Sequence, residues 1–135
     1  MIFLSHVLEH IPNPHNFVQN LRSICTPGAI VGIVCPNDAS LTAVAKRFFF
    51  YPKGFTHEFG HLHWPMHLSG FTPSSMNLLL SSEGFTRLLS TTWNKTQKIY
   101  GFTVQGKEKL VYPLYVAEKL TRRGNLLVAY FKAPD

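Results

Sequence analysis

The chain has 135 residues, 45% of them hydrophobic and 15% charged, which is typical of one folded domain and excludes a disordered segment. Its apolar runs are too short to cross a bilayer, and MIFLSHVLEHI lacks the basic start of a secretory signal, so we expect a cytoplasmic protein. The formal net charge of +6 is scattered through amphipathic segments of the last third, which favours a solvated face over nucleic-acid binding. Cys25 and Cys35 form no CxxC pair, so we expect reduced thiols with a structural role.

The first third of the chain predicts two strands with a helix between them. Residues 2–4 form a short apolar run, as in a buried strand, and Pro12-Asn13-Pro14 then breaks the chain. An amphipathic helix is indicated by the helical spacing of Phe17, Val18, Leu21, Ile24 and Cys25. Residues 30–35 form a continuous apolar run bounded by Pro36-Asn37, which is typical of a strand covered on both faces.

Further helices and strands follow in alternation. Asp38 or Ser40 can cap a helix whose expected apolar stripe is Leu41, Val44, Ala45, Phe48 and Phe49. Thr72-Pro73 begins another helix, in which Met76, Leu79 and Leu80 are expected to be buried and which Gly84 ends. We then expect a strand over 85–93, a helix over 107–123 kinked at Pro113, and a last strand over 125–132.

This alternation predicts an α/β fold in which about four strands form a mostly parallel sheet, flanked by helices, with an antiparallel last strand. Ligands of such sheets bind beyond the carboxyl ends of the strands. We therefore expect the site among residues 5–10, after the first strand, and residues 36–38, after the second.

The stretch HEFGHLHWPMH over residues 57–67 contains the HExxH pattern of zinc peptidases. That pattern needs a helix to place both histidines on one face, but Gly60 lies inside it and Pro65 follows it. Trp64 stands where the longer signature has a glycine that turns the chain back to the metal. We interpret the stretch as an aromatic and histidine-rich loop and assign no metal ligand in it. Adventitious zinc or nickel binding by its histidines stays open.

Two segments resemble a known family. LSHVLEHIPNPHNFVQNLRSICTPGAIVGIVCPN resembles the fourth strand to the fifth strand of class I S-adenosylmethionine-dependent methyltransferases of type 11 and 12, and HLSGFTPSSMNLLLSSEGF resembles a later helix of that family. The resemblance implies a Rossmann-like fold in which the strands of this chain are the fourth to the seventh of the family, in the sheet order 4-5-7-6. It also implies methyl transfer to a small-molecule acceptor, with S-adenosylmethionine as the cofactor.

The resemblance assigns roles to particular residues. Ser5, His6 and Val7 would line the methionine part of the cofactor, and Leu8 would pack nearby. His10 could act as a general base because an imidazole exchanges a proton near neutral pH, and a helix-terminal histidine bound to a loop carbonyl is the alternative. Glu9 is more typical of a capping or salt-bridge residue than of a catalytic one.

The remaining candidates lie on the substrate side. Asn37 is either a substrate-facing group or a turn-forming residue. The histidine-rich loop, with His61 and His63, would overhang the same end of the sheet and contact the substrate, although simple packing onto the sheet is the plainer interpretation. His67 is the second catalytic candidate.

The chain departs from the family pattern in lacking a GxGxxG loop after a strand, and Ala29 replaces the second glycine of the usual turn. We therefore expect residues 1–135 to be one partial domain, the C-terminal half of a methyltransferase, without the glycine-rich cofactor half and inactive by itself. Residues 2–4 would then form an exposed sheet edge, which predicts homodimerisation or aggregation through this edge.

Two other hypotheses stay open. One is a metal-dependent hydrolase that uses His57, His61 and His67 with Glu58. The other is a non-catalytic binding domain that uses the basic C-terminal end.

Overall fold

A single four-stranded sheet organises the protein. The computed structural model describes residues 1–50, 66–94 and 108–135. The strands are β1 (Ile2–Ser5), β2 (Ile30–Pro36), β3 (Thr86–Trp93) and β4 (Leu126–Lys132). Their order is β1-β2-β4-β3, with β1 parallel to β2 and β4 antiparallel to both of its neighbours. The expected α/β class, the strand order and the antiparallel last strand are therefore confirmed. The sheet is mixed and not mostly parallel, because β4 lies between β2 and β3 and pairs with both in the antiparallel sense.

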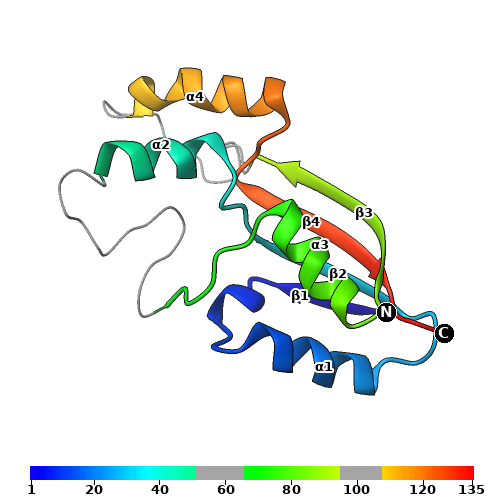
Figure 1. Cartoon of the computed structure of the whole chain (residues 1–135). Coiled ribbons are helices and arrows are strands. Elements are labelled where there is room, and N and C mark those ends of the chain that lie inside the picture. Colours follow the sequence, from blue (N-terminus) through cyan, green and yellow to red (C-terminus); the bar gives the residue numbers. More distant parts are fainter. Residues whose placement is uncertain (51–65, 95–107) are drawn as a thin grey trace.

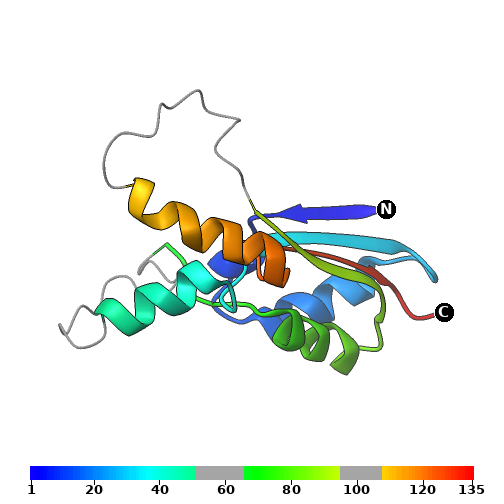
Figure 2. The ribbon, with the colours of Figure 1, turned by 90° about the horizontal axis from the view of Figure 1, so that it is seen from above.

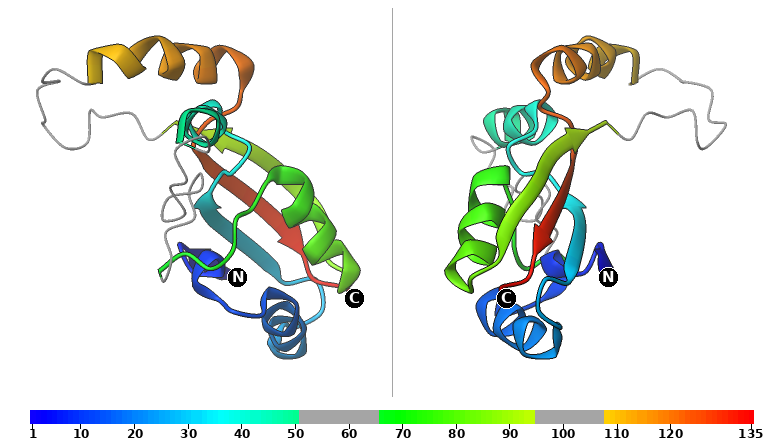
Figure 3. Two further views of the ribbon diagram at one scale, coloured as in Figure 1. Left: turned by 60° about the vertical axis from the view of Figure 1, so that its left-hand side comes forward. Right: turned by 90° about the vertical axis from the view of Figure 1, so that its right-hand side faces the viewer.

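The helices lie in two places around this sheet (Figure 1). They are η1 (Leu8–His10), a single 3-10 turn, and α1 (Pro14–Ile24), α2 (Leu41–Phe50), α3 (Pro73–Ser82) and α4 (Glu108–Thr121). Helices α1 and α3 cover one face of the sheet (Figure 2). Helices α2 and α4 pack against each other beyond the end of the sheet where β1, β2 and β3 terminate (Figure 3).

The core lies between the sheet and helices α1 and α3. Alternate residues of the central strands point into it, because successive side chains of a strand face opposite sides. Its largest fully buried apolar side chains include Leu8, Ile33, Met76, Leu80, Leu127 and Phe131. Cys35 is also buried there, whereas Cys25 at the end of α1 is partly exposed.

The other face of the sheet carries apolar side chains that stay accessible. The strand register places Phe3, Gly32, Tyr130 and Leu89 in one row across the four strands. Phe3 is 53% exposed and Leu89 is 50% exposed. Of the described strands, only β2 pairs with β1, so β1 is an edge of the sheet.

The expectations for single helices had mixed outcomes. Helix α3 is capped by Thr72, which exchanges hydrogen bonds with Ser75, and its buried residues are the three expected ones. The stripe expected for α2 is wrong in part, because Val44 and Phe48 are exposed while Ala43 is fully buried. Helix α2 lies beyond the end of the sheet, where it packs against α4. Within the described part of the chain, no helix is long and apolar enough to cross a membrane.

Candidate functional site

The candidate site lies at the carboxyl end of the parallel pair β1 and β2. The backbone of His6 continues the ladder, since its N–H donates to the carbonyl of Val34 at 2.8 Å. The chain then turns sharply, and His6 has φ of 54°, in the left-handed region that non-glycine residues rarely adopt. Strained backbone of this kind is concentrated at functional sites, and the turn brings η1 next to the strand end.

The side chains of His6 and Glu9 are in hydrogen-bond contact across this turn. Nδ1 of His6 lies 2.9 Å from Oε1 of Glu9, and the Glu9 side chain is 2% exposed against 44% for His6. The other carboxylate oxygen of Glu9, Oε2, is buried and has no hydrogen-bond partner in the described part of the structure. A buried carboxylate oxygen without a donor is costly, so this atom is a candidate to hold a cation.

His10 and His67 meet beside Glu9. Nδ1 of His10 lies 2.6 Å from the carbonyl oxygen of Met66. A carbonyl can only accept, so Nδ1 carries the hydrogen and the lone pair of a neutral His10 is on Nε2. The rings of His10 and His67 have centroids 4.9 Å apart at an angle of 65°, so they approach edge to face.

Main-chain contacts hold the segment that carries His67 in place. The N–H groups of Leu68 and Ser69 donate to the carbonyl of Glu9 at 2.7 and 3.1 Å. Further along, Phe71 forms a parallel bridge with Asn37, and its carbonyl accepts from the N–H of Asp38 at 2.8 Å. Residues 66–71 therefore connect the end of β1 to the end of β2.

Asn37 is tied into the fold by its own side chain. It is 1% exposed, and its Nδ2 donates to the carbonyl of Gly124 at 2.7 Å while its Oδ1 accepts from the N–H of Ala39 at 3.1 Å. These contacts agree with the turn-forming role that the sequence left open. They join the end of β2 to the start of β4.

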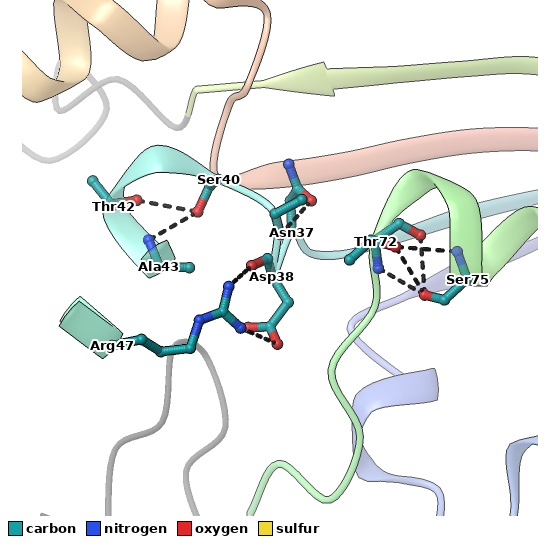
Figure 4. Close-up of polar contacts among 9 residues, drawn as sticks. Asn37, Asp38, Ser40, Thr42, Ala43, Arg47, Thr72 and Ser75 are labelled. Carbon is teal, nitrogen blue, oxygen red and sulfur yellow. Dashed lines mark hydrogen bonds and ion pairs between the residues drawn. The ribbon is translucent and has the colours of Figure 1, made fainter. Parts of the chain in front are cut away.

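The start of α2 is organised by polar contacts that Figure 4 shows in part. Arg47 donates to Oδ2 of Asp38 at 3.1 Å and to the Asp38 carbonyl at 2.5 Å. Ser40 caps the helix, since its Oγ accepts from the N–H of Ala43 at 3.1 Å (Figure 4). Of the two capping residues considered from sequence, Ser40 is therefore the helix cap.

The other predicted site residues are placed as follows. Ser5 is exposed and Val7 is partly exposed at the strand end, while Leu8 is 1% exposed and packs in the core. Leu8 thus anchors the turn after β1 to the hydrophobic core. His61 and His63 lie outside the described residues, as do His57 and Glu58 of the hydrolase hypothesis.

Sequence reasoning missed two buried carboxylates. Glu9 was expected to be a capping or salt-bridge residue, and it does contact His6, but its burial was not predicted. Glu118, near the basic C-terminal end of the sequence, is fully buried as well. Glu118 lines a cavity of about 260 Å³ together with Trp93, Lys119 and Arg122. Among the predicted site residues that the structure describes, none lines this cavity. The LEH triplet beside a strand end was the signal that could have identified Glu9, whereas no local pattern marks Glu118.

The fold has clear relatives among solved structures. A SAM-dependent methyltransferase from Archaeoglobus fulgidus aligns with a TM-score of 0.56 at 16% identity, over 96% of this chain and 57% of that one. A S-adenosylmethionine-dependent methyltransferase from Mesorhizobium loti gives 0.56 at 11% identity, over 96% and 59%. A chain of the complex that contains the Haloferax volcanii Trm112 methyltransferase activator gives 0.59 at 11% identity, over 98% and 53%. The chain thus spans somewhat more than half the length of these structures.

The four-stranded sheet with its site at the strand ends places the protein in the class I methyltransferase fold. A family model described as "Methyltransferase domain" matches residues 1–90, and the chain belongs to this family. No curated protein sequence matches the chain significantly.

Proposed function

We propose that this chain serves methyl transfer from S-adenosylmethionine to a small-molecule acceptor. The observation that carries the proposal is the family match over residues 1–90, which includes every described candidate of the site. The hydrolase hypothesis is not favoured, because the family and the related structures are those of methyltransferases.

The cofactor would bind at the end of β1. Ser5 and Val7 have accessible side chains there, and ligands of such sheets bind beyond the carboxyl ends of the strands. These residues fit the methionine part of the cofactor. The 135 residues contain no GxGxxG loop for its other part. Binding of cofactor by these residues alone is therefore expected to be weak.

The bound cofactor supplies an activated methyl group, and the protein has to align the acceptor and exclude water. We assign the acceptor side to His10 and His67, whose rings lie together beside the strand end. Nδ1 of His10 donates its hydrogen bond to the Met66 carbonyl. The lone pair on Nε2 is therefore available to take a proton from the methyl-accepting substrate. His61 and His63 remain proposed contacts of the substrate.

The chain is also proposed to self-associate. β1 has an unpaired edge among the described strands, and Phe3 beside it is 53% exposed. Such an edge is a template for pairing with another strand. A second copy of β1 is the proposed partner.

Titration of the ¹⁵N-labelled chain with S-adenosylhomocysteine, followed by NMR, tests the cofactor assignment. We expect the amide signals of Ser5, His6 and Val7 to shift with S-adenosylhomocysteine and not with adenosine, because they would border the amino-acid part. Unchanged signals of these residues at millimolar ligand would overturn the assignment. Shifts confined to α4 would place the ligand in the cavity beside Glu118 instead.

A further inference from the structure

We propose that Glu9, His10 and His67 form a binding site for a first-row divalent transition metal ion such as Zn²⁺. Each of these residues offers one ligand atom, and the three atoms lie within 4.8 Å of one another. Bonds to zinc are about 2.0 to 2.2 Å long, so the three atoms would move together by roughly 1 Å to share one ion. His10 is exposed at the surface, which leaves its side chain room for such a movement.

The buried carboxylate gives the site its negative charge. Glu9 is 1% exposed, and its Oε1 is paired with His6 while its Oε2 has no hydrogen-bond partner among the described residues. Burying an ionised carboxylate away from water costs a large free energy unless a cation neutralises its charge. A metal ion bound to Oε2 would supply the missing interaction.

His10 already has the arrangement of a metal ligand. The second ring nitrogen of a metal-bound histidine is usually held by a backbone carbonyl or a carboxylate, which fixes the tautomer. Nδ1 of His10 has that contact with the Met66 carbonyl, at 2.6 Å, so Nε2 is the atom left to bind a metal.

The third ligand is brought in by the backbone. The two hydrogen bonds from Leu68 and Ser69 to the Glu9 carbonyl fix residues 67–69 against η1. The His67 ring consequently lies edge to face with the His10 ring, 4.9 Å between centroids. Ligands from two distant segments thus converge without the HExxH pattern of residues 57–61.

The ligand types select the metal. Two imidazoles and one carboxylate suit zinc, cobalt, iron or nickel, whereas magnesium and calcium prefer oxygen ligands only. Three protein ligands leave coordination positions open for water or another small ligand. A bound ion and a proton would compete for the same Nε2 of His10, so His10 would accept a proton only in the metal-free state of the protein.

Isothermal titration of the tag-free, metal-stripped 135-residue chain with Zn²⁺ tests the site. We expect one ion per chain, and affinity at least about tenfold weaker in His10→Ala, His67→Ala and Glu9→Gln. The matched controls are His15→Ala, on the exposed surface of α1, and His57→Ala, in the HExxH pattern, both expected to bind as the parent does. Far-UV circular dichroism confirms that each variant is folded, and the surface variant His10→Ala covers the case in which Glu9→Gln does not fold.

X-ray absorption of the Zn²⁺ complex provides a second readout, since imidazole rings give a recognisable scattering pattern. Two imidazoles and additional oxygen ligands are expected. Three or more imidazoles, or loss of binding in His57→Ala alone, would assign the ion to the histidine-rich loop and overturn the proposal. Parent-like affinity in both His10→Ala and His67→Ala would overturn it as well, as would the absence of binding by the folded parent at millimolar Zn²⁺.

Discussion

Glu118 caps helix α2 from a different helix. Its Oε1 accepts from the backbone N–H of Thr42 at 2.8 Å and from the Thr42 hydroxyl at 2.7 Å. A carboxylate at a helix N-terminus satisfies donors that the helix leaves unpaired and interacts favourably with the helix dipole. This contact connects α2 to α4 through polar groups.

Replacing Glu118 by alanine is expected to lower the free energy of unfolding by about 2 to 3 kcal/mol, because hydrogen bonds to a buried charged group are lost and a cavity forms. Urea denaturation measures the change. Lys119→Ala, which removes an exposed neighbour on the same helix, serves as the control and should change the value by less than about 0.5 kcal/mol. Equal effects of the two substitutions would show that the cap contributes nothing.

The backbone strain at His6 predicts an unusual order of stability. His6 has φ of 54°, which glycine adopts freely and alanine does not, so His6→Gly should be more stable than His6→Ala by about 1 kcal/mol. Both variants lack the imidazole, so the comparison isolates the backbone. At Gln19, on the exposed surface of α1, alanine should instead be the more stable by about 0.5 to 1 kcal/mol. Thermal melting of the four variants measures these differences. If alanine were more stable than glycine at both positions, the result would argue against backbone strain at His6.

A side chain at Gly124 should be poorly tolerated. An added Cβ would lie within 2.5 Å of the backbone carbonyl group of Trp93, which cannot move without shifting β3. We expect Gly124→Ala to cost about 1 to 3 kcal/mol of unfolding free energy. At Gly32 the added Cβ meets the rings of Phe3 and Tyr130, and the exposed Phe3 ring can rotate away. Chemical denaturation should therefore show a smaller loss for Gly32→Ala, and the reverse order would contradict the close approach at Gly124.

Cys35 predicts a loss of stability at alkaline pH. Burial, together with the smaller effect of the negative charge of Glu9, raises the pKa of its thiol from 9.0 to about 12. In the unfolded chain the thiol ionises at the ordinary pKa, so between about pH 9 and pH 12 ionisation favours the unfolded state. The free energy of unfolding should fall by up to about 1.4 kcal/mol per pH unit from this group.

The matched variant is Cys35→Ala, in which this part of the alkaline decrease should vanish while contributions from other groups remain. Denaturation curves at a series of pH values give both slopes. The same burial predicts that, in the native protein, iodoacetamide labels Cys25 and leaves Cys35 unmodified. Labelling of both thiols at equal rates would refute the buried position of Cys35.

The edge of β1 predicts concentration-dependent dimers. Phe3→Lys places a charge beside this edge and should weaken self-association at least about tenfold, as charged edges do in natural sheets. Sedimentation equilibrium measures the association constant. Leu78→Lys, at an exposed leucine of α3, is the control and should leave the constant unchanged. If the unsubstituted chain were monomeric at all concentrations, a second copy of β1 could not be the partner of this edge.

Features that depend on residues close together in the chain were predicted from the sequence, and features that depend on contacts between distant segments were not. The strands, the start of α3 at Thr72-Pro73 and its end at Gly84 were predicted correctly, because periodicity, helix caps and glycine turns act within a few residues. The position of residues 5–10 at the carboxyl end of β1 was also predictable from the apolar run that precedes them, and their role in a site stays a prediction. The stripe of α2 was not predictable, since the partner of that helix lies far away in the chain.

By itself, the sequence determined the α/β class, the order of elements and the family, all of which depend on local patterns or on motifs along the chain. Only the tertiary structure decided that Glu9 is buried with one oxygen unpartnered, that His67 lies against His10, and that Glu118 caps α2. Each of these depends on contacts between distant segments. Burial and hydrogen-bond partners are set by such contacts and leave no periodic trace in the sequence.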